Sequence, residues 1–453
     1  RTPSTRSRLV DAVVWAALAS ATTMLVLYVV FAVGWQTRAF PGFTVTPSMV
    51  VTNAGPTSGV AWNGLAAGIR PDDRVVAVNG TPLPESTTNT LAARTEFDRL
   101  LAGMPVGTPL TVTVLRLDAS TADYTFETQA APAAFAQAPT PVKFALDWAL
   151  QGNHAVFTMA VDKGHFTREG LAVTMDRGFG SGDTVTKVAS GAYDIGYADL
   201  NTLIPFNANP ANTNKITGVL LVMDQSLAGA IFHKGTVANP KAIEGRKLAA
   251  PEADAGRLLF PAFARAQGID LAKINWQTVT PQLRETLLVQ RQVDGVTGFI
   301  STSVFNIKMA GIQPADLTVY RYNDYGVDLL GSALIVSQAY AEKNPETVRK
   351  FIRASIAGIK DALADPKTGM AQLKQRDPLF NEAIELERFE MVRDLTMLTA
   401  NVRQNGLSAV PADRLAKSVD TVAQAYNVGG KVNPADVYTD RFLPPVADRR
   451  IAR

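Results

Sequence analysis

The pattern of hydrophobic and polar residues first marks a segment near the N-terminus. Residues 12–33, AVVWAALASATTMLVLYVVFAV, are largely apolar and carry no charge. A helix of this length spans roughly 30 Å of hydrocarbon. Arginines precede the segment, so the positive-inside rule places residues 1–11 in the cytoplasm and the remainder of the chain outside. We therefore expect a transmembrane helix at 12–35, with a cleaved signal peptide or a buried core helix as the alternatives.

Residues 38–127 show the short strand and helix patterns of a small, mainly-β domain. The segment LAAGIRPDDRVVAVNGTPL (65–83) contains a helix end, an acidic turn and a strand that closes on Asn79-Gly80, a dipeptide typical of tight turns. A helical run at 94–103 precedes PLTVTVLRL (109–117), where apolar and polar residues alternate as in a half-buried strand.

This order of elements resembles a PDZ domain. Phe40-Pro41-Gly42-Phe43 stands where the carboxylate-binding loop of that family lies. PDZ domains bind extended peptides by adding a strand beside this loop. The resemblance implies a peptide or protein partner, with Gly42 and Phe43 in the peptide-binding loop. A purely structural domain is the alternative.

The pattern changes again after an Ala/Pro-rich linker at 128–140. From residue 141 onward, strand patterns alternate with helical ones. Several strands are apolar on both faces, as in a sheet that helices cover on both sides. After residue 337 the pattern predicts helices, because apolar residues recur at helical spacing in NPETVRKFIRASIAGIKDALADP. The sequence therefore predicts an α/β fold over 141–453.

Composition excludes several classes of function. The chain has 453 residues, 44 basic and 41 acidic side chains that look evenly mixed, and a formal charge of +3. The sequence has no basic stripe of the kind that would indicate a nucleic acid partner. The absence of cysteine excludes disulfides, thiolate metal sites and thiol nucleophiles. The three histidines, His154, His165 and His233, show no metal-ligand spacing, so we expect no metal site.

Two short stretches carry the candidate chemistry. DWALQGNHA (147–155) places an acid and an indole directly after a strand and then an amide beside an imidazole. FGSGDT (179–184) joins a strand to a helix, and its glycines allow backbone N–H groups to face a polar ligand at the helix N-terminus. Ser181 or Asp183 could instead cap that helix. Neither a P-loop nor a GxSxG nucleophile elbow is present.

Several sequence motifs, taken together and in this order, are specific enough to indicate a family. LDWALQGNHA, KGHFTREGLAV, GSGDTVTKVASGAYDIGYADL and DYGVDLLGSALIVSQAYAEKNPETVRKFIRA resemble the NMT1/THI5-like (SsuA/THI5-like) family of periplasmic solute-binding proteins. The resemblance covers about 141–425. It implies a two-lobed periplasmic binding protein (type II) with the ligand held in the cleft between the lobes. Lobe 1 would comprise 141–236 and 330–453, and lobe 2 would comprise 237–329.

The resemblance also implies a set of ligand-binding residues, each at a strand end or in a loop that faces the cleft. In this set Trp148 would stack on a flat ring, where aromatic contact adds about 1 kcal/mol beyond burial. The set is Asp147, Trp148, Asn153, His154, Gly180, Ser181, Gly182, Asp183, Thr184, Tyr197, Asp199, Gly298, Phe299, Asp324 and Tyr325.

The same family has an enzyme branch, the eukaryotic pyrimidine synthases, which consume pyridoxal phosphate and one of their own histidines. The Schiff-base lysine of that branch would fall near Ala198, and the donor histidine near Thr202. Its cysteine-rich iron site has no counterpart in a chain without cysteine. Without the amine no aldimine forms, so we expect no enzyme activity, no catalytic residues and no cofactor.

The leading hypothesis is a membrane-anchored extracytoplasmic protein that captures a small planar nitrogen heterocycle, such as a thiamine-precursor pyrimidine or riboflavin, for an ABC permease. Acidic residues near the site would accept hydrogen bonds from ring amines and disfavour an anion such as a sulfonate. A ligand-occupancy sensor that signals through the PDZ-like domain is the alternative, because an importer subunit needs neither the anchor nor that domain. The pyrimidine synthase is the second alternative.

Overall fold

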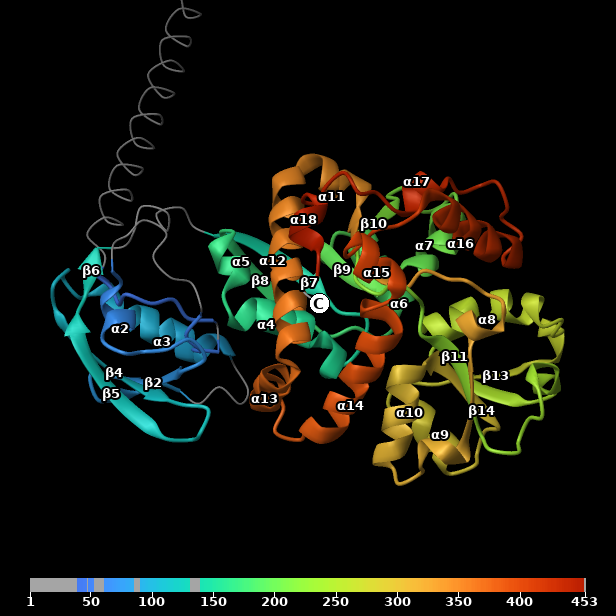
Figure 1. Cartoon of the computed structure of the whole chain (residues 1–453), viewed down its shortest axis with the longest axis horizontal. Coiled ribbons are helices and arrows are strands. Elements are labelled where there is room, and N and C mark those ends of the chain that lie inside the picture. Colours follow the sequence, from blue (N-terminus) through green and yellow to red (C-terminus); the bar gives the residue numbers. More distant parts are fainter. Residues whose placement is uncertain (1–38, 47, 53–60, 85–89, 131–138, 452–453) are drawn as a thin grey trace, which may run out of the picture. The chain divides into compact units, whose positions relative to one another are not determined.

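The computed structural model describes residues 39–46, 48–52, 61–84, 90–130 and 139–451 (Figure 1). The expected cytoplasmic segment and transmembrane helix, residues 1–35, lie outside this set. None of the helices within the described ranges combines the length and the apolar character needed to cross a bilayer. The chain divides at Pro139/Thr140 into two compact units, which we name the N-terminal and the C-terminal unit.

The described residues of the N-terminal unit form one larger antiparallel sheet, one strand pair and two helices. Its elements are β1 (Ala39–Phe40), α2 (Asn63–Ala66), β2 (Arg74–Val78), β3 (Thr81–Pro82), α3 (Thr90–Ala102), β4 (Pro109–Leu115), β5 (Thr121–Glu127) and β6 (Gln129–Ala130). The sheet has the order β3-β2-β4-β5, and β1 pairs with β6. This arrangement agrees with the expected small domain of mainly β structure.

Local sequence explains two features of this sheet. Asn79 and Gly80 have φ angles of 47° and 74°, the left-handed values that a two-residue type I′ hairpin turn requires. The predicted tight turn between β2 and β3 is therefore confirmed. Along β4 every second residue is buried, and Leu110, Val112 and Val114 enter the core of the unit, as the alternating pattern predicted.

The loop of Gly42 and Phe43 is part of the same core. Phe43 is buried, and its ring centre lies 6.3 Å from that of Phe97 and 6.2 Å from that of Phe126. Gly42 has a φ of 74°, and a Cβ at this position would come within 2.5 Å of the backbone nitrogen of Asn63. The Phe43 side chain thus anchors the loop in the core of the unit.

The C-terminal unit is built on two five-stranded sheets, each the centre of one lobe (Figure 1). The sheet of lobe 1 has the order β10-β16-β9-β7-β8, formed by β7 (Thr140–Ala145), β8 (Leu171–Asp176), β9 (Ile195–Asp199), β10 (Ile216–Leu221) and β16 (Ser332–Ser337). The sheet of lobe 2 has the order β13-β12-β14-β11-β15, formed by β11 (Ala228–His233), β12 (Lys247–Ala250), β13 (Asn275–Thr278), β14 (Gly295–Phe299) and β15 (Leu317–Arg321).

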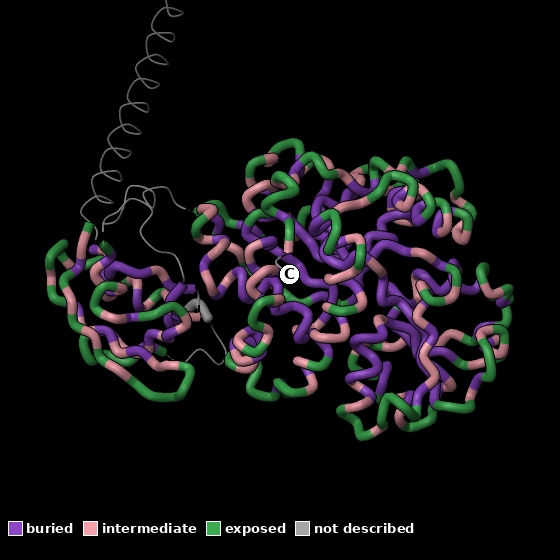
Figure 2. Tube along the Cα trace, in the orientation of Figure 1, coloured by how far each residue is buried: buried purple, intermediate pink, exposed green. Residues whose placement is uncertain are grey.

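Helices surround both sheets. They are α4 (Ala155–Asp162), α5 (His165–Arg168), α6 (Ser181–Ala189), α7 (Leu203–Ala208), α8 (Ala255–Ala266), α9 (Arg284–Val289), α10 (Ile300–Met309), α11 (Gln338–Lys343), α12 (Pro345–Ala364), α13 (Pro366–Arg376), α14 (Glu382–Val392), α15 (Ala400–Asn405), α16 (Ala412–Ala425), α17 (Pro434–Val437) and α18 (Val446–Arg449). Strands β9, β10, β11 and β16 are buried along their whole length, as expected for apolar strands between helical layers (Figure 2).

The chain crosses between the lobes at 222–227 and at 322–331, which link β10 to β11 and β15 to β16. The first crossing lies before β11, whereas the sequence suggested a boundary at 236/237. Strand β11 is apolar on both faces and would suit the interior of either sheet, so its pattern alone does not show which sheet it joins. Helices α14 and α16 contact elements of both lobes, namely η2 (Gly152–His154) and α10 for α14, and α7 and α8 for α16.

We predict that Phe43→Ala destabilises the N-terminal unit by about 3–5 kcal/mol, because it leaves a cavity among Phe97 and Phe126. Hydrogen exchange of the β4 amides in the full chain would measure this loss. The exposed Leu117, replaced by alanine, is the control and should change stability by less than about 0.5 kcal/mol. Equal protection of β4 in the wild type and in Phe43→Ala would contradict the anchoring role.

Candidate ligand cleft between the lobes

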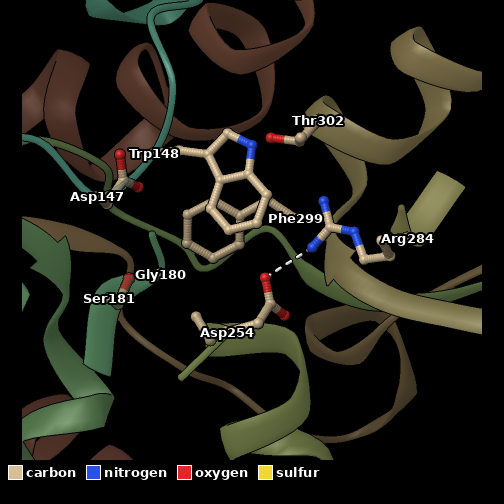
Figure 3. Close-up of a pocket in the computed structure, with 9 residues that line it drawn as sticks. Asp147, Trp148, Gly180, Ser181, Asp254, Arg284, Phe299 and Thr302 are labelled. Atoms are coloured by element: carbon tan, nitrogen blue, oxygen red, sulfur yellow. Dashed lines mark hydrogen bonds and ion pairs between the residues drawn. The ribbon is translucent and has the colours of Figure 1, made fainter. Parts of the chain in front are cut away.

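A cavity opens between the two lobes of the C-terminal unit, where side chains from both converge around one indole ring (Figure 3). Its empty space is about 250 Å³, including the part open to solvent. Lobe 1 contributes Asp147, Trp148, Gly180 and Ser181, and lobe 2 contributes Asp254, Ala255, Arg284, Phe299 and Thr302. These residues follow the carboxyl ends of strands or begin the helices after them, which is where open α/β sheets hold ligands.

A buried guanidinium lies against the indole. The Arg284 side chain is 1% exposed, and its Cζ lies 4.7 Å from the centre of the Trp148 ring. Its Nη1 donates to Asp254 Oδ2 at 2.7 Å (Figure 3). Its Nε donates to Glu285 Oε1 at 2.7 Å. Gly298 makes room for this group, because a Cβ there would come within 2.4 Å of Arg284 Nη1. One face of the indole is therefore covered by a cation that has two carboxylate partners.

Burial and charge act in opposite directions on this cluster. Burial disfavours the charged form of Arg284, but Glu285 and Asp254 outweigh that effect and raise the pKa of the guanidinium. Burial also raises the pKa of Asp254, and the attraction of Arg284 offsets this only in part. Asp254 also caps α8 by accepting from the backbone N–H of Arg257 at 3.2 Å. Arg284 accordingly stays charged in the cleft.

Asp147 is held by the imidazole of His154. Asp147 Oδ1 lies 3.0 Å from His154 Nε2, and both side chains are buried. His154 Nδ1 accepts the backbone N–H of Gln151 at 3.1 Å, so the ring proton must be on Nε2, where it donates to Asp147. His154 is thus neutral and orients the carboxylate of Asp147, a residue that lines the cavity.

Asp199 is buried where β9 ends, beside the crossing between the lobes. Its Oδ2 accepts from Ser226 Oγ at 2.6 Å, and its Oδ1 accepts from Asn201 Nδ2 at 2.8 Å. Burial raises the pKa of Asp199 to about 6, against these hydrogen bonds. The Asp199 backbone N–H donates to Ser181 Oγ at 3.0 Å, which links this carboxyl to the cavity lining.

The lobes touch across the cleft. The N–H of Gly182 in lobe 1 donates to the carbonyl of Ala253 in lobe 2 at 3.0 Å. Gln151 Oε1 accepts from Thr302 Oγ1 at 3.0 Å. A Cβ at Gly180 would come within 2.5 Å of the Ala253 carbonyl oxygen. The glycines of the FGSGDT loop therefore permit close approach of the two lobes.

Behind this contact a second buried arginine joins the lobes through α14. Arg388 Nη1 donates to the carbonyl of Ser301 at 2.8 Å, and Arg388 Nε pairs with Glu385 Oε2 at 2.8 Å. The same Glu385 oxygen accepts the backbone N–H of Gly152 at 2.7 Å. Helix α14 thereby ties the start of α10 in lobe 2 to η2 in lobe 1.

The structure brings together one third of the ligand-binding residues suggested by the sequence. Asp147, Trp148, Gly180, Ser181 and Phe299 line the cavity. A second group lies behind or beside the lining: His154 pairs with Asp147, Tyr197 and Asp199 are buried at β9, Gly298 lies against Arg284, and Gly182 meets Ala253. These residues position the lining without facing the cavity.

The remaining residues of that set lie elsewhere. Asp183 pairs with Lys187 at 2.8 Å on the outside of α6, and Thr184 Oγ1 donates to the carbonyl of Leu146. Asn153 is buried in η2, outside the lining. The Asp324 carboxylate is taken by Arg321, three residues before it, and Tyr325 packs edge-on against Tyr320. The residues that sequence reasoning missed are Asp254, Ala255, Arg284 and Thr302. Only Asp254 had a local signal, an acid before the helical run AGRLLF.

The described residues contain no group of three or more His, Asp or Glu side chains that could hold a metal ion. The acidic residues of the cleft are instead engaged by His154 and Arg284.

We predict that Asp199→Asn stabilises the protein more at pH 8 than at pH 5, by about 1 kcal/mol. The pKa is raised from 3.8 to about 6, so the folded state binds the proton more tightly than the unfolded state. The contribution of protonated Asp199 to the stability of the wild-type protein is therefore fully present below about pH 4 and is lost as the pH rises through about 6. Urea unfolding at both pH values tests this, with the exposed Asp436→Asn as the control. A pH-independent difference would reject it.

We predict that Gly180→Ala separates the lobes, because its Cβ would clash with the Ala253 carbonyl. Hydrogen–deuterium exchange of the Gly182 amide should become at least about tenfold faster, as its hydrogen bond is lost. Gly191→Ala is the control, since Gly191 also has a positive φ but no atom within 4 Å of its Cβ. Unchanged exchange at Gly182 would show that the contact does not depend on Gly180.

Comparison with known proteins gives relatives along the C-terminal unit. The family model described as NMT1/THI5 like matches residues 151–369. Riboflavin-binding protein RibY of Chloroflexus aurantiacus is 26% identical over 340 residues, which is 70% of this chain and 90% of that protein. The formylaminopyrimidine-binding protein of Halalkalibacterium halodurans is 23% identical over 228 residues, 50% of this chain and 67% of that protein.

An enzyme is also among the relatives. The 4-amino-5-hydroxymethyl-2-methylpyrimidine phosphate synthase of Aspergillus parasiticus is 22% identical over 261 residues, 55% of this chain and 74% of that protein. Among solved structures, the alkanesulfonate-binding protein SsuA of Xanthomonas axonopodis pv. citri has a TM-score of 0.51 at 14% identity, covering 67% of this chain and 99% of that one. The C-terminal unit is thus similar to NMT1/THI5-like proteins over residues 151–369, and it has the fold of periplasmic binding proteins.

Proposed function

We propose that this chain is an extracytoplasmic solute-binding protein that captures a small planar nitrogen heterocycle and delivers it to an ABC permease. The observation that carries the proposal is the cavity between the lobes, to which one lobe contributes Trp148 and the other contributes Phe299 and Arg284. An aromatic ring beside hydrogen-bonding groups suits a flat, polar ligand. The riboflavin- and formylaminopyrimidine-binding relatives support the same class of ligand.

The cavity leaves little space while the lobes are closed. About 20 Å³ of it admits water-sized spheres, which is room for roughly one water molecule, whereas ligand pockets commonly measure about 300–1,000 Å³. A pyrimidine and a flavin therefore both require the lobes to move apart before they enter. The free oxygen of Asp147 would accept a hydrogen bond from a ring amine.

A binding role agrees better than synthesis with the residues at β9. The synthase chemistry needs an amine near Ala198 and an imidazole near Thr202. Both positions are buried, and the Thr202 hydroxyl donates to the Asp199 carbonyl at 2.7 Å. In the proposal Asp147, oriented by His154, holds a ligand and does not transform it.

The proposal extends to the N-terminal part of the chain. The apolar segment 12–33 would anchor the protein in the membrane, with the binding unit outside the cytoplasm. The PDZ-like N-terminal unit would bind a peptide or protein partner beside the loop of Gly42 and Phe43. The positive φ of Gly42 and the buried Phe43 ring are consistent with a loop of fixed shape.

We predict that Trp148→Ala weakens binding of a pyrimidine or flavin ligand about tenfold or more, because both the buried area and the aromatic contact are lost. Calorimetry on the purified chain, with ligand identified by mass spectrometry of what it releases, measures this. Trp276→Ala is a matched control: Trp276 also lies under an arginine, Arg257, at 4.9 Å but outside the cavity. Full affinity in Trp148→Ala would reject the proposed site, and so would tight binding of taurine without any heterocycle.

A further inference from the structure

The guanidinium of Arg284 has one nitrogen without a partner. Nε and Nη1 donate to Glu285 and Asp254, whereas the buried Nη2 has no hydrogen-bond acceptor among the described residues. A buried donor left unsatisfied is costly, and proteins rarely retain one without a reason. Arg284 lines the cavity between the lobes (Figure 3). The open N–H groups therefore indicate that an acceptor arrives from outside the chain.

Two further lining groups have a hydrogen to donate. Ser181 Oγ accepts from the Asp199 N–H and donates to no described residue. The Trp148 indole N–H likewise has no acceptor in the part of the chain that the structure describes, and the cation of Arg284 lies over the face of the ring. Three residues of the lining thus have hydrogens to donate, and no described residue donates to the second carboxylate oxygen of Asp147, Oδ2. This inventory fits a ligand whose acceptors outnumber its donors.

The charges of the cleft decide between a neutral and an anionic acceptor. The positive charge of Arg284 is already opposed by the carboxylates of Asp254 and Glu285, both at 2.7 Å. Asp147 adds a third negative charge, because the His154 that holds it is neutral. An anionic ligand would bring a further negative charge into this buried group, and like charges disfavour one another strongly where water is excluded.

We propose that Arg284 is the specificity-determining residue of the cleft and that the ligand presents a neutral carbonyl oxygen to its Nη2. This inference rests on the proposed function, and it adds that the heterocycle must carry an amide or lactam edge beside the indole. A heterocycle with amines alone would satisfy Asp147 but offer Arg284 and Ser181 only ring nitrogens, which have one lone pair each where a carbonyl oxygen has two. A sulfonate or carboxylate would accept hydrogen bonds from these donors, but its negative charge would be repelled by the carboxylates of the cleft.

The test uses calorimetry on the full chain with three 4-amino-2-methylpyrimidines of similar shape, which carry a carboxamide, a carboxylate or a methyl group at position 5. The carboxamide should bind about tenfold to a hundredfold more tightly than the methyl compound, as expected for a hydrogen bond from a charged donor. It should also bind more tightly than the carboxylate. This comparison uses the unmutated protein and so does not depend on the folding of any variant.

Arg284→Lys then assigns the preference to the residue, since lysine keeps a cation beside Asp254 but has no group at the Nη2 position. The preference for the carboxamide should disappear in Arg284→Lys and persist in Arg257→Lys, a matched arginine over Trp276. Equal affinities for the three probes in the wild type, or tightest binding of the carboxylate, would overturn the inference and leave the proposed function standing.

Riboflavin, which has carbonyl groups on its ring system, serves as a fourth probe. If it binds while the pyrimidines do not, Arg284→Lys must weaken it at least about tenfold; undiminished binding would reject the role of Arg284. If neither the pyrimidines nor riboflavin bind to the wild-type chain, the proposed function fails and this inference fails with it.

Discussion

The buried ion pairs of Arg284 are the interaction on which the cleft depends. Removing a guanidinium from water costs several kcal/mol unless its hydrogen-bonding groups are met, and here Asp254 and Glu285 meet two of its three nitrogens. Asp254 is at the same time the cap of α8, and Glu285 accepts from Ser303 at the start of α10. The arginine therefore fixes the positions of the helices that form the lobe 2 wall, and Trp148 of lobe 1 closes over it.

A second arginine performs the equivalent task between the lobes. Arg388 is fully buried in α14, and its partners are a carboxylate on its own helix and backbone carbonyls at the start of α10. Its companion Glu385 accepts the N–H of Gly152, directly after the stretch that supplies Asp147 and Trp148. The C-terminal helices thus do more than cover lobe 1. They also connect the two walls of the cleft through α14.

Local physics made part of this structure predictable. The Asn79-Gly80 turn, the alternation along β4 and the apolar strands of the lobes follow from backbone preferences and side-chain period, which act over a few residues. The same holds for Asp147 and Trp148, because polar groups after a buried strand fall at the edge of a sheet. Arg284 was not predictable in this way. The position of Arg284 in the cavity depends on contacts with Asp254, Trp148 and Gly298. These residues are distant from it in sequence and meet it only in the folded chain.

Family resemblance also assigned residues to the ligand site that lie outside the cavity. Asp324 falls on the return crossing between the lobes, yet Arg321 lies one turn before it and takes its carboxylate. Asp183 stands in the glycine loop, but Lys187 follows at the spacing of a helical ion pair. In both cases a local partner of opposite charge competes with an external ligand, and the local partner is always present. A carboxylate with a basic residue three or four positions away is thus a weaker site candidate than one such as Asp147, whose partner His154 is neutral.

The closed arrangement of the lobes explains why a ligand would be selected by both walls together. The neutral contacts across the cleft, Gly182 to Ala253 and Thr302 to Gln151, are hydrogen bonds of a kind that contributes about 0.5–1.5 kcal/mol each. Such contacts alone hold the lobes together only weakly, so the population of the closed state is easily shifted. Trp148 and Arg284 belong to different lobes and meet only when the cleft is closed. A molecule that contacts the indole and also accepts a hydrogen bond from Nη2 of Arg284 binds the closed state preferentially. The ratio of its affinities for the closed and the open state determines the fraction of molecules that are closed.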